Sequence, residues 1–221
     1  MRIQHLFFEP LAIEHSWESK VFFWSDLHLR HNRDFIYEPR KFKTVQESDE
    51  TLLRRWRENI TDRDIVFLLG DTVFGANGEE YLNGLFQKLP FKELFIMPGN
   101  HFAGYKQLFN HTVMQHIDPS LPIHPNKVVN FIPNYFEIFV NGQAIVMSHY
   151  AIVSWNGCSK GSWLLHGHNH NNLTLDLGKA IDLGVENCPD PQSFEDITKR
   201  MNEKKNITFD HHGPNDRNPF C

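Results

Sequence analysis

Short hydrophobic runs alternate with stretches of helical periodicity in the first half of the chain. Residues 21–24, 65–69 and 94–97 predict buried strands, because each is an uninterrupted hydrophobic run stopped by polar or turn-forming residues. Thr44, followed three residues later by Glu47, matches a capping box and predicts the start of a helix. A second helix is predicted over 79–89. Strands that alternate with helices are typical of a sheet flanked by helices.

The second half of the chain has a different pattern. Asn141-Gly142 separates two hydrophobic runs and strongly indicates a two-residue hairpin turn. We therefore expect this half to be antiparallel or mixed, and to end with a helix over 193–204. The polar stretch 207–221 is expected to be a poorly ordered tail, which leaves one domain over 1–206. The strands predicted here are 128–132, 135–140, 143–147, 163–165, 173–177 and 180–183.

Composition excludes several classes of protein. Of the 221 residues, 40% are hydrophobic and 22% are charged, which fits neither a disordered nor a membrane-embedded chain. The net charge of −5 gives no overall attraction to nucleic acid or to an anionic membrane, so a nucleic-acid site would have to be local. No uncharged apolar stretch is long enough to span a bilayer. The three cysteines have no paired spacing, which argues against a disulfide framework and favours a reducing, cytoplasmic location.

Five polar clusters follow predicted strands. Because the carboxyl ends of strands in an open α/β sheet share one edge, side chains that are far apart in sequence are expected to converge there. Each cluster alone is an ordinary turn or surface pair, but five in succession at strand ends favour a functional site. The clusters are Asp26-Leu27-His28, Gly70-Asp71, Gly99-Asn100-His101, Ser148-His149 and Gly167-His168-Asn169-His170.

The residue types in these clusters suit a metal centre. Asp26 and His28 are two residues apart, as are His168 and His170, so in an extended chain each pair points to one side. A carboxylate such as Asp71 can bridge two ions about 3.5–4 Å apart. The candidate ligands supply oxygen and imidazole nitrogen but no thiolate, which suits manganese, iron, nickel, cobalt or zinc.

This ordered set of motifs resembles the signature of the calcineurin-like metallophosphoesterases. The resemblance extends from residue 21 to about 204 and is strongest with the small single-domain members from bacteria and phages. It implies an α/β fold of the mixed α+β kind: a four-layer α/β/β/α sandwich of two mixed sheets flanked by helices, with the metal site at the carboxyl ends of the strands.

The resemblance also implies roles for individual residues. One divalent ion would be held by Asp26, His28, Asp71 and His170, and a second by Asp71, Asn100, His149 and His168. A hydroxide bridging the two ions would attack phosphorus in line, and His101 would protonate the leaving oxygen as general acid. Manganese is the favoured ion. The family commonly has Asp or Glu directly after this histidine, where the present chain has Phe102.

The expected function is hydrolysis of a small phosphoester. A phosphodiester, of a nucleotide or cyclic nucleotide kind, is favoured over a monoester because no segment for a substrate-selecting cap is visible. His31 and Asn32 match the pattern of the small members and are expected to contact substrate. The alternatives are a metal-dependent nuclease on polymeric nucleic acid, which the negative net charge disfavours, and a catalytically weak scaffold of the same fold. No membrane partner is expected, and the sequence leaves the substrate and the oligomeric state open.

Overall fold

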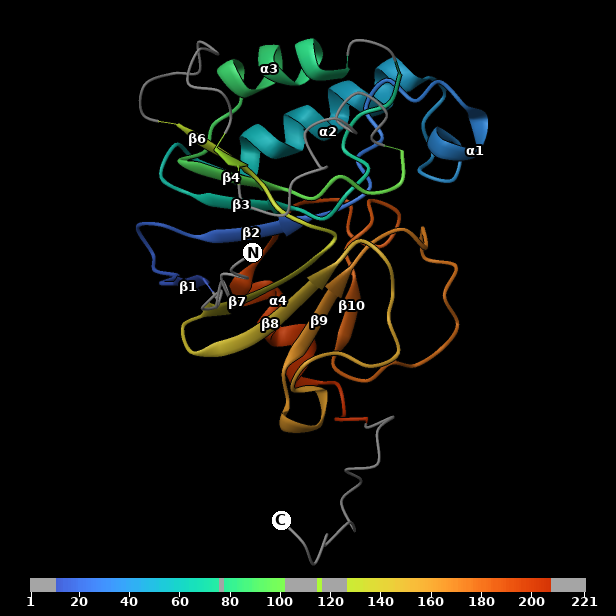
Figure 1. Ribbon diagram of the computed structural model, residues 1–221. Coiled ribbons are helices and arrows are strands. Elements are labelled where there is room, and N and C mark those ends of the chain that lie inside the picture. The colour runs from blue at the N-terminus through green and yellow to red at the C-terminus, as the bar shows by residue number, and fades with distance from the viewer. Residues whose placement is uncertain (1–10, 76–77, 102–114, 117–126, 208–221) are drawn as a thin grey trace, which may run out of the picture.

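Two mixed β-sheets lie face to face, and the helices α2 (Val45–Asn59) and α3 (Gly78–Lys88) cover the outer face of the first sheet (Figure 1). The computed structural model describes residues 11–75, 78–101, 115–116 and 127–207. Within these residues the mixed α/β architecture predicted from the sequence, with two mixed sheets and flanking helices, is confirmed.

The first sheet has the strand order β11-β2-β3-β4-β6-β5, and the second has the order β1-β7-β8-β9-β10. In the first, β2, β3, β4 and β6 are parallel, and in the second, β8, β9 and β10 are parallel. The carboxyl ends of these strands therefore meet along one edge of each sheet. The strands of the first sheet are β11 (Gln192–Ser193), β2 (Val21–Trp24), β3 (Ile65–Leu68), β4 (Glu93–Ile96), β6 (Val128–Phe131) and β5 (Gln115–His116). Those of the second are β1 (Leu11–Ile13), β7 (Tyr135–Val140), β8 (Gln143–Ser148), β9 (Trp163–His166) and β10 (Ala180–Asp182).

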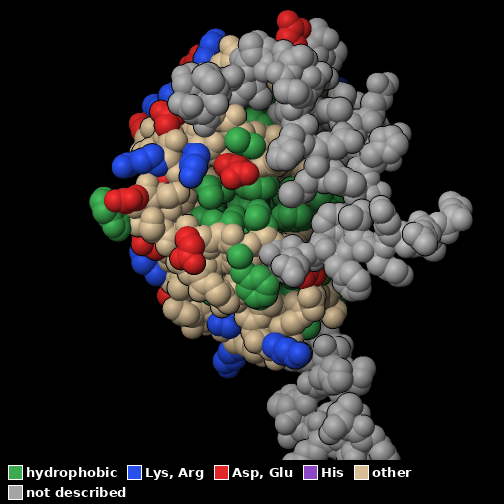
Figure 2. All heavy atoms as spheres, turned by 60° about the vertical axis from the view of Figure 1, so that its left-hand side comes forward, with side chains coloured by type: hydrophobic (Ala, Val, Ile, Leu, Met, Phe, Trp, Pro, Cys, Tyr) green, Lys and Arg blue, Asp and Glu red, His purple; other side chains and the backbone are tan. Residues whose placement is uncertain are grey.

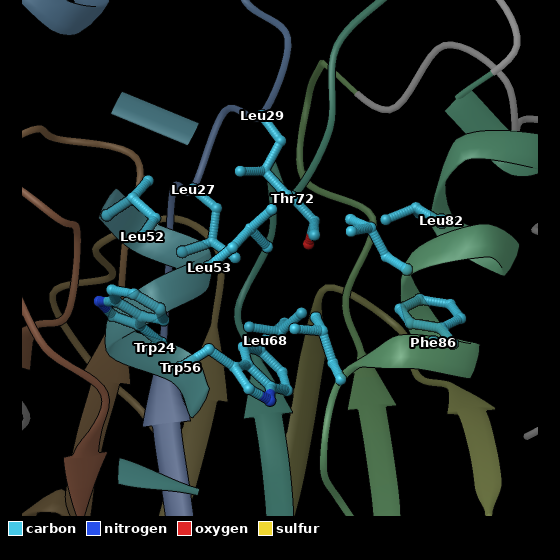
Figure 3. A pocket seen from close by; sticks show the side chains of 12 residues that line it. Trp24, Leu27, Leu29, Leu52, Leu53, Trp56, Leu68, Thr72, Leu82 and Phe86 are labelled. Carbon is cyan, nitrogen blue, oxygen red and sulfur yellow. The ribbon is translucent and has the colours of Figure 1, made fainter. Parts of the chain in front are cut away.

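Strand β2 shows why the runs in the first sheet are continuously hydrophobic. Its alternate residues belong to two different cores: Phe22 and Trp24 pack toward the helices, whereas Val21 and Phe23 pack between the sheets. A strand buried on both faces needs apolar side chains at every position. The core between the first sheet and the helices surrounds a small cavity lined by apolar side chains and by Thr72 (Figure 3).

The hairpin turn and the start of helix α2 lie where the sequence predicts them, although only the Thr44 half of the predicted capping box forms, since Glu47 Oε2 accepts from Lys43 N and not from Thr44 N. Asn141 and Gly142 join β7 to β8, with φ values of 48° and 79°, as a two-residue type I′ turn requires. Thr44 accepts a hydrogen bond from Glu47 N at the start of α2. Helix α4 (Phe194–Asn202) begins with a complete capping box between Ser193 and Asp196.

One predicted strand is wrong. Residues 173–177 form an irregular loop, although their alternation of leucines with polar residues is typical of a strand. The strand that pairs with the free side of β9 is instead β10. Leu173 and Leu175 are consequently exposed, and only Leu177 is buried.

The short elements β1, β5, β11 and α1 (Asp34–Tyr37) were not predicted, because two to four residues carry too little periodicity. The predicted tail lies almost entirely outside the described residues, since 208–221 are not among them. No helix in the described part of the chain is both long and apolar enough to cross a membrane.

Charged side chains of both signs are mixed over the side of the molecule where β2 begins, and hydrophobic side chains gather in the middle of that face (Figure 2).

Candidate metal centre

The loops after β2 and β3 run side by side and continue the pairing of the two strands. Asp26 N donates to Gly70 O at 3.2 Å, His28 N donates to Asp71 O at 2.8 Å, and Leu29 N donates to Thr72 O at 3.0 Å. These bonds fix the two loops against each other at the carboxyl edge of the sheet. These backbone hydrogen bonds thereby fix the positions of Asp26, His28 and Asp71, in addition to the contacts of their side chains.

The backbone is strained at most of the candidate ligands. Asp26, His28, Asp71, His168 and His170 all have positive φ, between 47° and 69°, in the left-handed region that residues other than glycine rarely adopt. Such residues cost of order 1 kcal/mol each and persist only where surrounding contacts enforce them. Their concentration at one edge indicates a site whose geometry is held against local preference.

Three glycines allow the strand ends to approach closely. A β-carbon on Gly70 would collide with the His149 ring, one on Gly99 with the Asp71 carboxylate, and one on Gly167 with Asp26. Gly70 and Gly99 also have positive φ values of 112° and 74°. The absence of side chains at these positions brings the ligands of different strands together.

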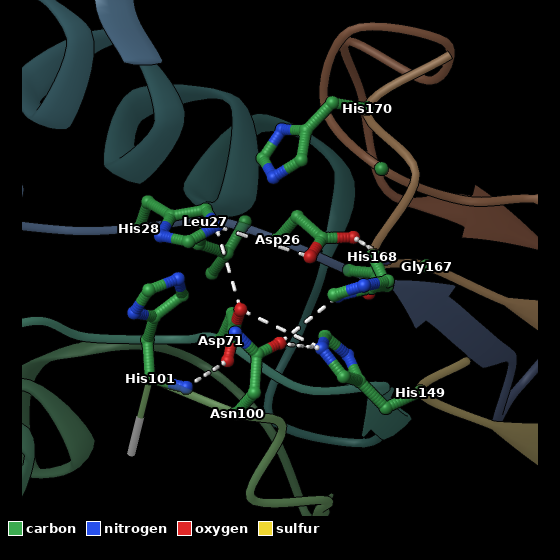
Figure 4. A network of polar contacts seen from close by, with 12 residues as sticks. Asp26, Leu27, His28, Asp71, Asn100, His101, His149, Gly167, His168 and His170 are labelled. Carbon is green, nitrogen blue, oxygen red and sulfur yellow. Dashed lines mark hydrogen bonds and ion pairs between the residues drawn. The ribbon is translucent and has the colours of Figure 1, made fainter. Parts of the chain in front are cut away.

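Two groups of side chains could each hold a cation (Figure 4). The first is Asp26, His28 and His170, and the second is Asp71, His149 and His168. In each group the ligand atoms lie within 4.8 Å of one another.

Asp71 belongs to the second group and also lies next to the first. Its Oδ2 is 3.6 Å from His28 Nε2 on one side and 3.5 Å from His149 Nε2 on the other. Asn100 completes the second group, because its Oδ1 lies 2.8 Å from His149 Nε2 and 2.9 Å from His168 Nδ1. The structure thus brings together all seven residues predicted as ligands, with Asp71 in the shared position.

Unpartnered buried atoms support a cation in the first group. Asp26 Oδ1 and His28 Nε2 are buried, and neither has a hydrogen-bond partner in the described part of the chain. A buried polar atom without a partner is costly, and a bound ion is one way to satisfy it. The carboxylate and imidazole donors fit a divalent ion of the first transition series.

Burial and neighbouring charge set the protonation of the groups. Burial raises the pKa of Asp26 to about 6 and lowers the pKa of His28 to about 2. For Asp71 burial alone would raise the pKa, but the hydrogen bond and charge of His149 outweigh it and lower the pKa to about 2. At neutral pH the His28 imidazole is therefore uncharged and Asp71 is ionised, as metal ligation requires.

His101 lies beside the centre without belonging to either group. Its backbone N–H donates to Asp71 Oδ1 at 2.8 Å, and its exposed ring lies 5.5 Å from the His28 ring. His31 is buried: it stacks on Phe74 at 3.8 Å, and its Nδ1 is 3.1 Å from His28 Nδ1. Asn32 is exposed, and its side chain is not brought into these contacts. Phe102 lies outside the described residues.

Two residues at the centre were missed by sequence reasoning. Glu186 Oε1 lies 2.9 Å from His170 Nδ1, and Arg40 binds the same oxygen at 2.8 Å. Glu186 follows the end of β10 just as the predicted ligands follow their strands, so its position was a usable signal. Arg40 lies in a loop and has no pattern around it that predicts its contacts.

Comparison with known proteins agrees with this geometry. A family model described as calcineurin-like phosphoesterase matches residues 19–220. The chain is 27% identical over 153 residues to the uncharacterized protein MJ1445 of Methanocaldococcus jannaschii, covering 69% of this chain and 70% of that protein. It is 24% identical over 205 residues to the gene 66 protein of Mycobacterium phage D29, covering 84% and 97%. A crystal structure of the protein of unknown function AQ665 from Aquifex aeolicus shares the fold, with a TM-score of 0.53 and 19% identity over 82% of this chain and 99% of that one.

Proposed function

The chain belongs to the calcineurin-like phosphoesterase family, and from this premise we propose that it is a two-metal phosphodiesterase acting on a small diester. The observation that carries the proposal is the position of Asp71 between two groups that could each hold a cation. A side chain in that position can serve both ions at once. The oxygen and imidazole donors suit manganese, iron, nickel, cobalt or zinc, and of these we propose manganese as the ion.

The seven candidate ligands would hold two divalent ions. Asp26, His28, Asp71 and His170 would hold one divalent ion, and Asp71, Asn100, His149 and His168 would hold the other. Bound divalent ions at such sites stabilise charge on phosphoryl oxygens and provide a water-derived nucleophile at neutral pH.

His101 is the candidate general acid. Its imidazole lies 5.5 Å from the His28 ring, belongs to neither group and makes no hydrogen bond within the described part of the chain, so an N–H of the ring could donate its proton to the leaving oxygen. The hydrogen bond from the His101 backbone N–H to Asp71 fixes the backbone position from which the imidazole extends. His31 is buried against His28, which supports a role in orienting that ring more than direct contact with substrate.

Exposed aromatic rings on two sides of the centre support a substrate with an aromatic substituent, as in a nucleotide diester. Phe35 is 68% exposed and its ring lies 5.8 Å from the His31 ring. Tyr150 is 41% exposed and its ring lies 4.7 Å from the His168 ring. Stacking of a base on such a ring contributes about 1–3 kcal/mol.

Hydrolysis of bis-p-nitrophenyl phosphate and of p-nitrophenyl phosphate, each with manganese, tests the proposal. We expect faster turnover of the diester and complete loss of activity on chelation. Asp71→Asn should abolish turnover. Asp64→Asn is the matched control, because Asp64 is a buried carboxylate before the amino end of β3, where it accepts a hydrogen bond from Lys20 N. Exclusive turnover of the monoester, or cleavage of single-stranded DNA without cleavage of small diesters, would contradict the proposed substrate class.

A further inference from the structure

A buried ion pair between Arg40 and Glu186 lies beside only one of the two candidate metal groups. The side chains of Arg40 and Glu186 are 1% and 9% exposed, and Arg40 Nε lies 2.8 Å from Glu186 Oε1. Burying two charges is costly unless further hydrogen bonds satisfy the remaining donors. Arg40 satisfies its own donors by donating from Nη2 to Asp26 O at 2.7 Å and from Nη1 to Leu27 O at 2.9 Å, whereas Glu186 Oε2 is buried without a hydrogen-bond partner in the described part of the chain. The arginine therefore fixes the strained turn that carries Asp26.

Glu186 connects this pair to His170. Its Oε1 lies 2.9 Å from His170 Nδ1, which leaves Nε2 as the ring nitrogen available to a cation. In Figure 4 the His170 ring points toward Asp26 and His28. When Nδ1 carries the proton and donates it to a carboxylate, Nε2 keeps its lone pair for a cation and becomes a stronger donor.

The second group has no such support. His149 Nδ1 lies 2.9 Å from the backbone oxygen of Leu69. His168 Nδ1 lies 2.9 Å from the amide oxygen of Asn100, which is itself a candidate ligand of this group. Both partners are neutral. Among the described residues that form the two groups, only His170 has a carboxylate outside the group as the partner of its second ring nitrogen.

We propose that Arg40 and Glu186 are positioning residues for the Asp26–His28–His170 group, and that they set its cation affinity separately from that of the second group. Glu186 orients His170 and increases its strength as a donor, whereas Arg40 neutralises Glu186 and fixes the backbone of Asp26 and Leu27. The inference rests on the two-metal centre of the proposed function, but it concerns metal binding and not turnover.

Titration of the metal-free full-length protein with Mn²⁺, followed by calorimetry and by the electron paramagnetic resonance signal of free Mn²⁺, tests this assignment. In Glu186→Ala we expect one of two equivalents to bind about 10–100-fold more weakly while the other is unchanged. Glu186→Gln can still accept the His170 hydrogen bond, so a smaller loss is expected from removal of the charge alone. Arg40→Lys should recover part of the affinity that Arg40→Ala loses.

Glu93→Gln is the matched control. Glu93 also accepts a hydrogen bond from a neighbouring side chain, Asn130 Nδ2, at 2.8 Å, but it lies at the amino end of β4. We expect the affinities of both Mn²⁺ equivalents to be unchanged in Glu93→Gln. The visible spectrum of the Co²⁺-loaded protein gives a second reading, because a change in the orientation of His170 alters the ligand field and a general loss of stability does not.

Three results would overturn the assignment. Equal affinities in the unmodified protein and in Glu186→Ala would exclude a role for the pair, and so would equal weakening of both equivalents in a variant whose circular dichroism is native. An unmodified chain that binds no ion would overturn the proposed function and this inference together, whereas the first two results leave the proposed function intact.

Discussion

At the scale of single residues, replacement of His101 distinguishes a loss of catalysis from a loss of metal binding. His101→Ala removes the ring but keeps the backbone N–H that donates to Asp71. We expect the variant to retain both ions and its fold while turnover falls about 10²–10⁴-fold, the usual contribution of a positioned acid. Metal analysis and steady-state kinetics on the same preparation measure the two effects.

The leaving group provides the internal control for this variant. A p-nitrophenolate leaving group needs little protonation, so its deficit should be smaller than that of an alkyl or nucleoside leaving group. Equal rates for the variant and the unmodified enzyme on both substrates, or loss of the ions, would contradict the role of His101 as the acid.

Replacement of Gly70 tests whether the metal site depends on the close approach of the strand ends. In Gly70→Ala the new β-carbon meets the His149 ring, and the φ of 112° is unfavourable for alanine. We expect lower stability and loss of metal from the group that contains His149. Gly142→Ala is the matched control: its φ of 79° is also positive, but nothing lies within 4 Å of the added carbon. The control should lose about 1 kcal/mol of stability and bind metal normally, as measured by denaturant unfolding and elemental analysis.

The candidate ligands could be predicted from sequence because a simple rule of topology places them. Each follows a hydrophobic run, and parallel strands bring their carboxyl ends to one edge. The roles of Arg40 and Glu186 could not be predicted in this way. Arg40 contacts Asp26, Leu27 and Glu186, which come from two distant segments, and no local spacing records that contact.

At the scale of elements, helix α2 supports the loop that follows Asp26 and His28. Asp49 on α2 accepts a hydrogen bond from Arg30 N at 2.9 Å, and Arg30 has a positive φ of 65°. Asp49 Oδ1 is buried and has no partner among the described residues. Burial raises the pKa of Asp49 to about 6, although Arg30 and Arg40 act in the opposite direction.

This raised pKa predicts a pH-dependent effect of Asp49→Asn. Because the pKa is higher in the folded state than in the unfolded state, the contribution of Asp49 to stability is present below about 3.8 and is lost as the pH rises through about 6. Asparagine keeps the acceptor and cannot ionise. The free energy of unfolding of the variant relative to the unmodified protein should therefore increase between pH 4 and pH 7.

Urea unfolding of the metal-free proteins across this range measures the difference, and the titration of the histidines cancels between the two proteins. Glu50→Gln, at the next and exposed position of α2, controls for removal of a charge from the helix. A difference between Asp49→Asn and the unmodified protein that stays constant with pH would exclude the buried ionisation of Asp49.

Elements were predictable where local chemistry decides the conformation. Asn141 and Gly142 are residue types that readily adopt the positive φ values of this turn, so the turn could be predicted from sequence. The 173–177 segment also alternates hydrophobic and polar residues, but β10 and not this segment pairs with β9. Such competition between segments is decided by tertiary structure and leaves no local signal.

At the scale of the whole molecule, each candidate metal group takes ligands from both sheets. Asp26 and His28 follow β2 of the first sheet, and His170 follows β9 of the second. The second group likewise combines Asp71 after β3 with His149 after β8. Bound ions would therefore connect the two sheets at their carboxyl edge, in addition to the hydrophobic core that already joins them.

Removal of metal should consequently lower the stability of the entire fold and not only activity. An ion that binds the folded state alone adds about 2.7 kcal/mol when its free concentration is 100 times its dissociation constant. For a chain of this length, that corresponds to about 5–10 °C in melting temperature for each ion. Differential scanning calorimetry against free Mn²⁺ should show a melting temperature that rises with metal concentration. Asp71→Asn should flatten this dependence, because Asp71 lies between both groups. A melting temperature that does not change while elemental analysis shows both ions leaving would mean that the core alone holds the sheets together at this edge.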